Sequence, residues 1–181
     1  IKKVKSLGIN RICSTHGPVW EKSVPSVVSL YDRMSRYEAG NGVCIAYGSM
    51  YGNTAKAAEY LAHMLEEEHI PYAMHDLCHE NYSYALRDVF KFDTIALGSP
   101  TYNNGIFPPV RQLMEGICDR SVKNRKFFAF GSYTWAGASV RLLGSMAESA
   151  GMDVISEGIQ FKQGFTPEKV DFSAILPLLK L

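Results

Sequence analysis

The sequence has no long hydrophobic run and almost no excess charge. No apolar stretch among its 181 residues approaches the roughly 20 that a membrane-spanning helix needs, and the basic N-terminal residues are not followed by the apolar core of a secretory signal. With 19 Lys and Arg against 18 Asp and Glu, the net charge is +1, so the basic excess typical of nucleic-acid-binding proteins is also missing. We therefore expect neither a membrane nor a nucleic acid as partner.

Paired cysteines are missing as well. Cys13, Cys44, Cys78 and Cys118 are widely spaced, with no CxxC motif, which argues against a zinc ribbon and against a disulfide framework. Cys44 lies in an apolar run and is interpreted as a small buried hydrophobic residue. A reducing compartment, the cytoplasm, is the expected location.

From residue 43 onward, short apolar segments alternate with longer amphipathic ones. The apolar segments predict strands at 43–48, 70–76, 92–98, 126–131 and 153–161. The amphipathic segments predict helices at 53–68, from 81 to about 88, and at 107–118, 138–150 and 167–179. Almost continuously apolar strands between helices indicate a parallel sheet whose two faces are both covered. We therefore predict an α/β fold, a doubly wound five-stranded parallel sheet with helices on both faces.

Residues 1–42 do not follow this alternation. Residues 9–14 predict a short strand, His16-Gly17-Pro18 a turn and residues 24–37 an amphipathic helix, before Gly40-Asn41-Gly42 interrupts the chain. We place a domain boundary here, between residues 1–42 and 43–181. Because the chain begins without methionine, we expect it to be part of a longer protein.

The stretch YGSMYGNT lies where the first strand of the second domain ends and the first helix begins. Ser49, Tyr51, Asn53 and Thr54 bring hydroxyls, an amide and backbone N–H groups to a helix N-terminus, which favours an anion. The stretch has neither the GKS/T of a nucleoside-triphosphatase loop nor the GxGxxG of dinucleotide-binding proteins. It suits a terminal phosphate held by hydrogen bonds and the helix dipole. The alternative is that Asn53 or Thr54 only caps the helix.

Two further polar loops follow the third and fourth strands. They run from Ser99 to Gly105 and from Ser132 to Gly137, and each contains an aromatic ring, Tyr102 or Trp135, among small polar residues. The carboxyl ends of parallel strands meet at one sheet edge, so we expect the three loops to form one site with a phosphate end and a flat, stackable end.

The three loops resemble the flavin mononucleotide (FMN) loops of flavodoxins, over residues 43–181, although Tyr51 stands where a threonine is usual. The resemblance implies a flavodoxin-like fold and non-covalent FMN. It assigns Ser49, Met50, Tyr51, Gly52, Asn53 and Thr54 to the phosphate, Pro100, Thr101, Tyr102, Asn103, Asn104 and Gly105 to one side of the isoalloxazine ring, and Ser132, Tyr133, Thr134, Trp135, Ala136 and Gly137 to the other. Trp135 or Tyr102 would stack on the ring.

The Met-Tyr pair of the first loop and the stretch RICSTHGPVWEKSVPSVVSLYDRMSRY at residues 11–37 resemble one branch, the flavodiiron proteins. In these, a metallo-β-lactamase-like di-iron domain precedes the flavodoxin-like domain. The resemblance makes residues 1–42 the end of that first domain and its connecting helix, with His16 at the last histidine ligand of a di-iron site that only the longer protein would complete. His63, His69, His75 and His79 are interpreted as surface residues.

The resemblance implies an electron-transfer module of an oxygen or nitric oxide reductase, with no catalytic acid or base of its own. Its expected partners are a rubredoxin-like or other electron donor and the di-iron domain of the same subunit or of a partner subunit in a homodimer. Two alternatives stay open: an NAD(P)H:quinone reductase of the flavodoxin-like superfamily, and a scaffold module without flavin.

Overall fold

The computed structural model describes residue 3 and residues 6–180 of the chain. It divides into two compact units, one ending at Ala39 and the other beginning at Gly40. The second unit thus starts three residues before the predicted strand at Val43. The assignment of the first unit to a metallo-β-lactamase-like domain stays a prediction.

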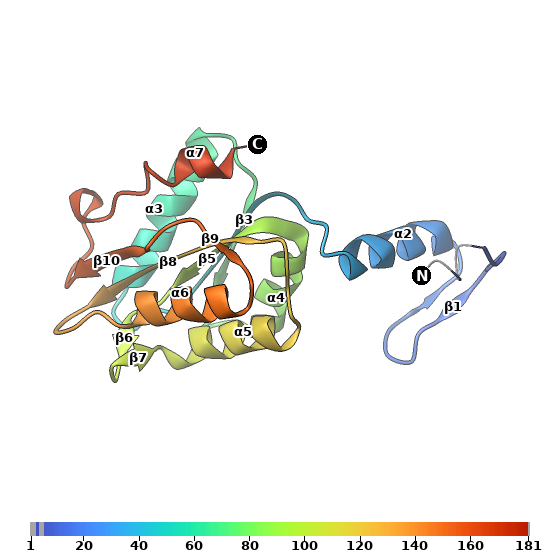
Figure 1. Ribbon diagram of the computed structural model, residues 1–181, viewed down its shortest axis with the longest axis horizontal. Coiled ribbons are helices and arrows are strands. Elements are labelled where there is room, and N and C mark those ends of the chain that lie inside the picture. The colour runs from blue at the N-terminus through green and yellow to red at the C-terminus, as the bar shows by residue number, and fades with distance from the viewer. Residues whose placement is uncertain (1–2, 4–5, 181) are drawn as a thin grey trace. The chain divides into compact units, whose positions relative to one another are not determined.

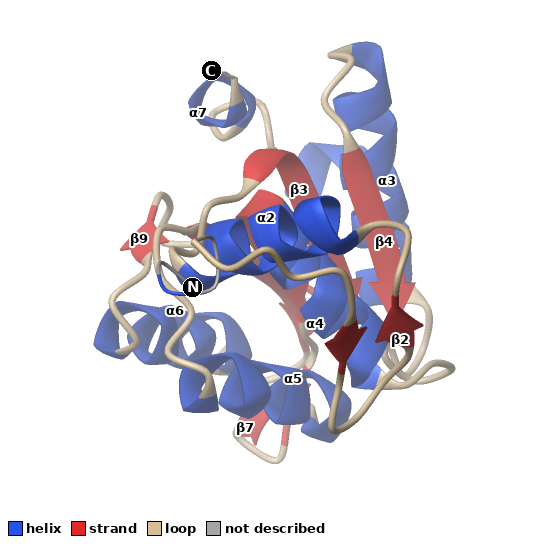
Figure 2. Cartoon of the chain, turned by 90° about the vertical axis from the view of Figure 1, so that its right-hand side faces the viewer, coloured by secondary structure: helices blue, strands red, loops and turns tan. Residues whose placement is uncertain are grey.

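In the described part of the first unit, a small hairpin is followed by a helix of twelve residues (Figure 2). Strands β1 (Ile12–Cys13) and β2 (Val19–Trp20) pair antiparallel, and helix α2 (Val24–Ser35) follows. A proline in the first turn of α2 is favourable there, because the first N–H groups of a helix have no acceptor within it. Strand β2 was not predicted, and the strand predicted at 9–14 is shorter than expected.

The second unit is built on a parallel sheet (Figure 1). Its strands, in spatial order, are β4 (Tyr72–Asp76), β3 (Gly40–Tyr47), β5 (Phe92–Gly98), β8 (Lys126–Tyr133) and β10 (Ile159–Lys162). All pairings are parallel, and a short strand β9 (Asp153–Val154) also pairs with β8. Numbered along the chain, the five positions run 2-1-3-4-5, the order of flavodoxin-like sheets. The predicted fold class is confirmed.

Helices cover both faces of this sheet. Helix α3 (Asn53–Glu67) and the C-terminal segment lie on one face, while α4 (Tyr82–Lys91), α5 (Pro108–Asp119) and α6 (Ser139–Ser149) lie together on the other (Figure 1). Alternate residues of β3 face opposite sides of the sheet. Ile45 belongs to the core with α3, and the Cys44 thiol lies 3.6 Å from the carbonyl of Ala85 in α4. Burial on both faces explains why the strands are almost continuously apolar.

Two predicted elements are wrong in extent. The strand predicted at 153–161 is split into β9 and β10 by a turn in which Gly158 has φ of 92°. The helix predicted at 167–179 is reduced to a 3-10 turn, η1 (Pro167–Lys169), and one short helix, α7 (Leu176–Leu179). The Asp171 carboxylate accepts the N–H of Ser173 and so favours a turn, and Pro177 has no N–H with which to continue a helix that began upstream.

A third difference concerns the histidines. His63, His69 and His79 are exposed as predicted, but the prediction was wrong for His75, which is only 5% exposed. Its Nδ1 lies 2.9 Å from Glu80 Oε1 and its Nε2 lies 2.9 Å from Asp88 Oδ2. These carboxylates hold the imidazole at the end of β4 against α4.

Candidate functional site

The three polar loops do meet at one edge of the sheet. Strands β3, β5 and β8 are neighbours, and the loop after each carboxyl end contributes to a cleft of about 230 Å³. The residues that line the cleft are Ser49, Met50, Tyr51, Asn53, Thr54, Pro100, Thr101, Tyr102, Asn103, Ser132, Tyr133, Thr134 and Gln163. Of the predicted site residues, Gly52, Asn104, Gly105, Trp135, Ala136 and Gly137 lie in the same loops but outside this lining.

The first loop presents the N-terminus of α3 to the cleft. Gly52 is the N-cap residue, with φ of 80°, and no side chain caps the helix from that position. The Ser49 hydroxyl instead accepts the N–H of Ala55 at 3.3 Å. Asn53 and Thr54 occupy the first turn, where backbone N–H groups have no acceptor within the helix. The alternative that Asn53 or Thr54 serves only as N-cap is therefore wrong.

The side chains of Asn53 and Thr54 connect the first loop to other parts of the cleft. The Thr54 side chain is 1% exposed, and its hydroxyl lies 3.3 Å from the hydroxyl of Ser132 at the end of β8. The side-chain oxygen of Asn53 accepts the N–H of Phe165 at 3.3 Å. These bonds fix the helix N-terminus against the third loop and against the chain beyond β10.

The second loop is a tight hairpin that the strand pattern did not predict. Strands β6 (Thr101–Tyr102) and β7 (Gly105–Ile106) are joined by Asn103 and Asn104, with φ of 47° and 55°. Two successive residues with positive φ are the signature of a type I′ turn, which asparagine tolerates well. The ring of Tyr102 packs edge-on against Phe107, with 5.8 Å between centroids, and about half of it stays exposed.

Thr101 ties the second loop to helix α6. Its hydroxyl accepts hydrogen bonds from the N–H groups of Ala138 and Ser139, at 3.0 and 3.2 Å. The same hydroxyl donates to the Ser139 hydroxyl at 3.2 Å. Ser139 in turn donates to the carbonyl of Ser99 at 2.9 Å. Thr101 therefore supplies the cap that the first turn of α6 lacks in its own sequence.

The third loop depends on two glycines that allow close approach. A Cβ at Gly131 would overlap the carbonyl oxygen of Ser99, and a Cβ at Gly137 would overlap the side chain of Gln160. The Trp135 side chain, 91% exposed, lies outside the lining of the cleft. Tyr102 and Tyr133 are the aromatic side chains of the second and third loops that line it.

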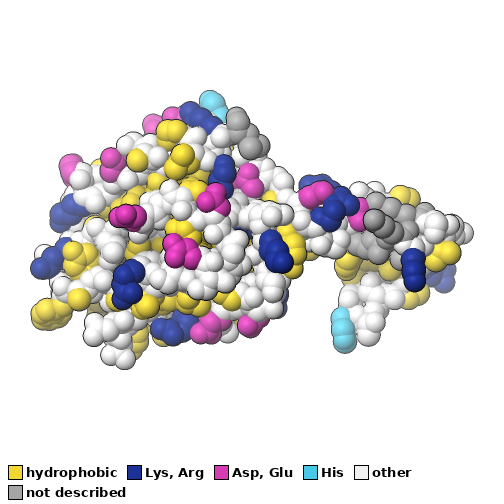
Figure 3. All heavy atoms as spheres, viewed as in Figure 1, with side chains coloured by type: hydrophobic (Ala, Val, Ile, Leu, Met, Phe, Trp, Pro, Cys, Tyr) yellow, Lys and Arg dark blue, Asp and Glu magenta, His cyan; other side chains and the backbone are white. Residues whose placement is uncertain are grey.

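Among residue 3 and residues 6–180, no charged side chain lines the cleft, whose polar groups are hydroxyls and amides. On the face of the second unit that Figure 3 shows, positive and negative side chains are interspersed, without a field of one sign. At the end of β3, burial raises the pKa of the Tyr47 phenol, so this side chain is neutral at physiological pH. An anion in the cleft would meet neutral donors and the α3 dipole.

Gln163 was not predicted as a site residue. It follows β10 directly, and β10 is parallel to β8 with Lys162 opposite Tyr133, so Gln163 leaves the sheet at the same edge as the third loop. The prediction ended the fifth strand at residue 161 and did not consider the loop beyond it. The same edge rule that located the other loops would have found it.

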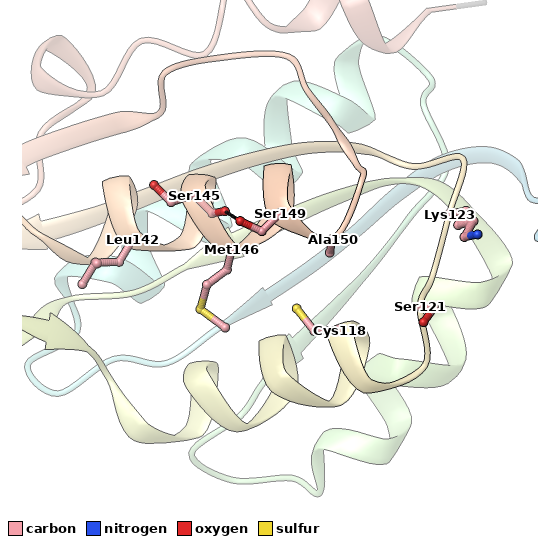
Figure 4. Close-up of a pocket in the computed structure, with 8 residues that line it drawn as sticks. All are labelled: Cys118, Ser121, Lys123, Leu142, Ser145, Met146, Ser149 and Ala150. Carbon is pink, nitrogen blue, oxygen red and sulfur yellow. Dashed lines mark hydrogen bonds between the residues drawn. The ribbon is translucent and has the colours of Figure 1, made fainter.

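A second cavity, of about 580 Å³, lies between α5 and α6 (Figure 4). Its lining combines Cys118 and Met146 with serines and Lys123. Burial raises the pKa of the Cys118 thiol, so the thiol is a poor nucleophile. The C-terminal end of α5 and the later turns of α6 form this cavity, at the opposite end of the strands from the cleft.

His16 is exposed in the loop between β1 and β2, where it lines a groove of about 590 Å³ together with residues of α2. Within residue 3 and residues 6–180, no group of three or more His, Cys, Asp or Glu side chains could hold a metal ion. No helix in the same part of the chain is both long and apolar enough to cross a membrane.

The fold agrees with the comparisons to known proteins. The flavodoxin family model matches residues 45–172, and the chain belongs to this family. The chain is similar to a nitric oxide reductase of Moorella thermoacetica, with 27% identity over 157 residues, which cover 87% of this chain and 39% of that protein.

Solved structures show the same architecture. Rubredoxin oxygen:oxidoreductase from Desulfovibrio gigas superposes with a TM-score of 0.87 at 24% identity, over 98% of this chain and 45% of that one. The flavodiiron protein from Giardia intestinalis gives 0.83 at 22% identity, over 96% and 44%. The predicted resemblance to flavodiiron proteins is confirmed, and the chain spans less than half the length of these relatives.

Proposed function

We propose that the cleft binds FMN non-covalently, with the phosphate at the N-terminus of α3 and the isoalloxazine ring between the second and third loops. The observation that carries the proposal is the convergence of three loops on one cleft lined by hydroxyls, amides and aromatic rings, in a chain of the flavodoxin family. A phosphate end without a counter-cation and a flat aromatic end fit this cofactor.

The roles of the residues follow from their places. Backbone N–H groups of Asn53 and Thr54 bind the phosphate, and the bond between Thr54 and Ser132 holds that end of the cleft at a fixed width. The Tyr102 ring lies against the isoalloxazine, with Trp135 as the second predicted stacking residue. When bound, FMN supplies transfer of one or two electrons. The lining contains no carboxylate and no imidazole, so we assign no proton transfer to these side chains.

We further propose that the chain is the electron-transfer part of a flavodiiron-type oxygen or nitric oxide reductase. In this proposal, FMN would supply electron transfer between a rubredoxin-like donor and a di-iron centre in a preceding metallo-β-lactamase-like domain, which His16 would help to complete. A homodimer would bring the cleft of one subunit near the metals of its partner. The Moorella relative is a nitric oxide reductase and the Desulfovibrio relative a rubredoxin oxygen:oxidoreductase, which supports this proposal. The four free thiols agree with the reducing cytoplasm expected from the sequence.

The test is a visible absorption spectrum of the purified chain, followed by equilibrium titration with FMN. We expect flavin bands or saturable binding at about one FMN per chain. Colourless protein that takes up no added FMN would overturn the proposal and favour the scaffold alternative. If the chain instead reduced quinones with NADPH in steady state, and did so faster than with single-electron donors, the result would favour the quinone reductase.

A further inference from the structure

A segment outside the three loops also contributes to the cleft. This segment, residues 163–165, is called the wall here; it follows β10, passes between the third loop and the start of α3, and places Gln163 in the lining. The Gln163 N–H donates to the Tyr133 carbonyl at 2.8 Å, and the Phe165 N–H donates to the Asn53 side chain at 3.3 Å. Phe165 also packs against Tyr60 of α3, with 5.8 Å between ring centroids. The wall is therefore anchored at Gln163 itself and again at Phe165.

Gln163 holds an unusual backbone conformation within this wall. Its φ is 63°, in the left-handed region that residues other than Gly, Asn and Asp seldom adopt. Such conformations cost free energy and persist where the surrounding structure fixes them, often at binding sites. Here the hydrogen bonds of the Gln163 and Phe165 N–H groups hold the backbone in place, and Gln163 lines the cleft.

The amide of Gln163 is available to a ligand. The hydroxyls of Thr54 and Ser132 bond to each other, and the Asn53 oxygen is occupied by the Phe165 N–H. By contrast, among the residues that the structure describes, none forms a hydrogen bond with the Gln163 side-chain amide. Gln163 is exposed and lines the same cleft as Asn53 and Thr54, and it stands two residues before Phe165, whose N–H bonds to Asn53 at the start of α3.

We propose that Gln163 is a ligand-binding residue that donates a hydrogen bond from its side-chain amide to the phosphate of the bound mononucleotide. This inference rests on the proposed function. The phosphate site would then combine the α3 N-terminus with a residue about 110 positions later in the chain. The hydrogen bond between Phe165 and Asn53, which are 112 residues apart, joins these two segments. The donors remain neutral, so the site distinguishes a phosphate by geometry and not by a counter-charge.

The experiment compares FMN with riboflavin, which lacks the phosphate, by fluorescence titration of the chain and of two variants. Gln163→Ala removes the amide, and Gln163→Glu keeps its shape but places a negative charge beside the phosphate. We expect Gln163→Ala to weaken FMN binding about tenfold, and Gln163→Glu to weaken it further, because a hydrogen bond to a charged group is lost in the first and repulsion is added in the second. Riboflavin affinity should be unchanged in both.

Gln112, which is exposed on α5 outside the cleft, provides the matched control, and its change to Ala or Glu should alter neither affinity. Circular dichroism and thermal midpoints would show that each variant folds. Equal losses for FMN and riboflavin, or no loss for either, would overturn the inference while leaving the proposed function intact. Failure of the unaltered chain to bind FMN would overturn both.

Discussion

Two polar clusters, each built around buried side chains, lie on the same sheet, and they differ in charge. At the cleft, Thr54, Ser132, Thr101 and Ser139 form hydrogen bonds between neutral groups. At the end of β4, His75 lies between the carboxylates of Glu80 and Asp88, and Arg87 donates to Asp88 at 2.8 and 3.2 Å. The neutral cluster positions loops around a ligand without fixing a charge there, whereas the ionic cluster fastens α4 to β4.

The difference teaches how one edge of a sheet can serve both binding and stability. A buried ion pair contributes little net stability, but removing one partner is costly because it leaves a buried charge uncompensated. A hydrogen bond between neutral hydroxyls contributes less to the free energy of unfolding, and its loss lowers that free energy less. We therefore expect changes in the ionic cluster to act on folding alone, and changes in the neutral cluster to act on folding weakly and on FMN binding.

The largest expected effect comes from Asp88→Ala. Asp88 is 2% exposed and bonds both His75 and Arg87, so its removal, which leaves the buried His75 Nε2 without this partner, should lower the free energy of unfolding by about 2–3 kcal/mol. Urea denaturation at pH 7 measures this loss, and Asp119→Ala, at an exposed position, is the matched control. A loss below about 1 kcal/mol would show that the ionic cluster does not hold α4.

The same cluster should make stability depend on pH. Burial alone would raise the pKa of Asp88, but hydrogen bonds from Arg87 and His75 outweigh it and hold the pKa below its usual value. The contribution is therefore present above the unfolded pKa of about 4 and is lost as the pH falls through the lower folded value. Unfolding measured from about pH 7 to pH 2 should show the stability of the natural chain approaching that of Asp88→Asn; a constant difference would contradict this assignment.

A smaller effect on folding, with an added effect on binding, is expected from Thr101→Val. Valine keeps the shape but removes the hydroxyl that accepts from Ala138 and Ser139, so we expect a loss of about 1–2 kcal/mol in unfolding free energy. Misplacement of the second loop should also weaken FMN binding by several-fold, about the effect of one hydrogen bond. Thr101→Ser, which keeps the hydroxyl, should restore both quantities. If the Thr101→Val variant were destabilised but bound FMN with unchanged affinity, the helix cap would contribute to folding and not to FMN binding.

The smallest expected effect is that of salt on FMN binding. Because none of the described residues that line the cleft is charged, raising the salt concentration from about 0.05 to 0.5 M should change the dissociation constant by less than about threefold. Isothermal titration at the two concentrations measures this. A much larger weakening at high salt would indicate that a lysine or arginine reaches the phosphate.

Much of this architecture could be predicted from the sequence, because the relevant patterns are local. The apolar run at Val43 and the helical spacing after Asn53 specify strand and helix, and the edge rule for parallel strands then brings three polar loops together. Asn103-Asn104-Gly105 could even have indicated the hairpin, since asparagine and glycine favour positive φ.

The features that were missed depend on contacts between distant residues. His75 is buried because Glu80 and Asp88 arrive from the following loop and helix, which no periodicity of β4 reveals. Gln163 reaches the cleft because β10 pairs with β8 as far as Lys162, a register that the apolar pattern ending at Phe161 does not contain. Trp135 is a prominent aromatic in the sequence, yet it lies outside the cleft lining.

The most direct test of the central claim is a parallel titration of the unaltered chain with FMN and with riboflavin. If the phosphate is held by the α3 N-terminus and its neighbours, FMN should saturate at about one per chain and bind at least about tenfold more tightly than riboflavin, the difference expected from one charge-assisted hydrogen bond or more. Equal affinities for the two flavins would contradict a phosphate site at α3, and absence of saturable FMN binding would contradict the cofactor assignment itself.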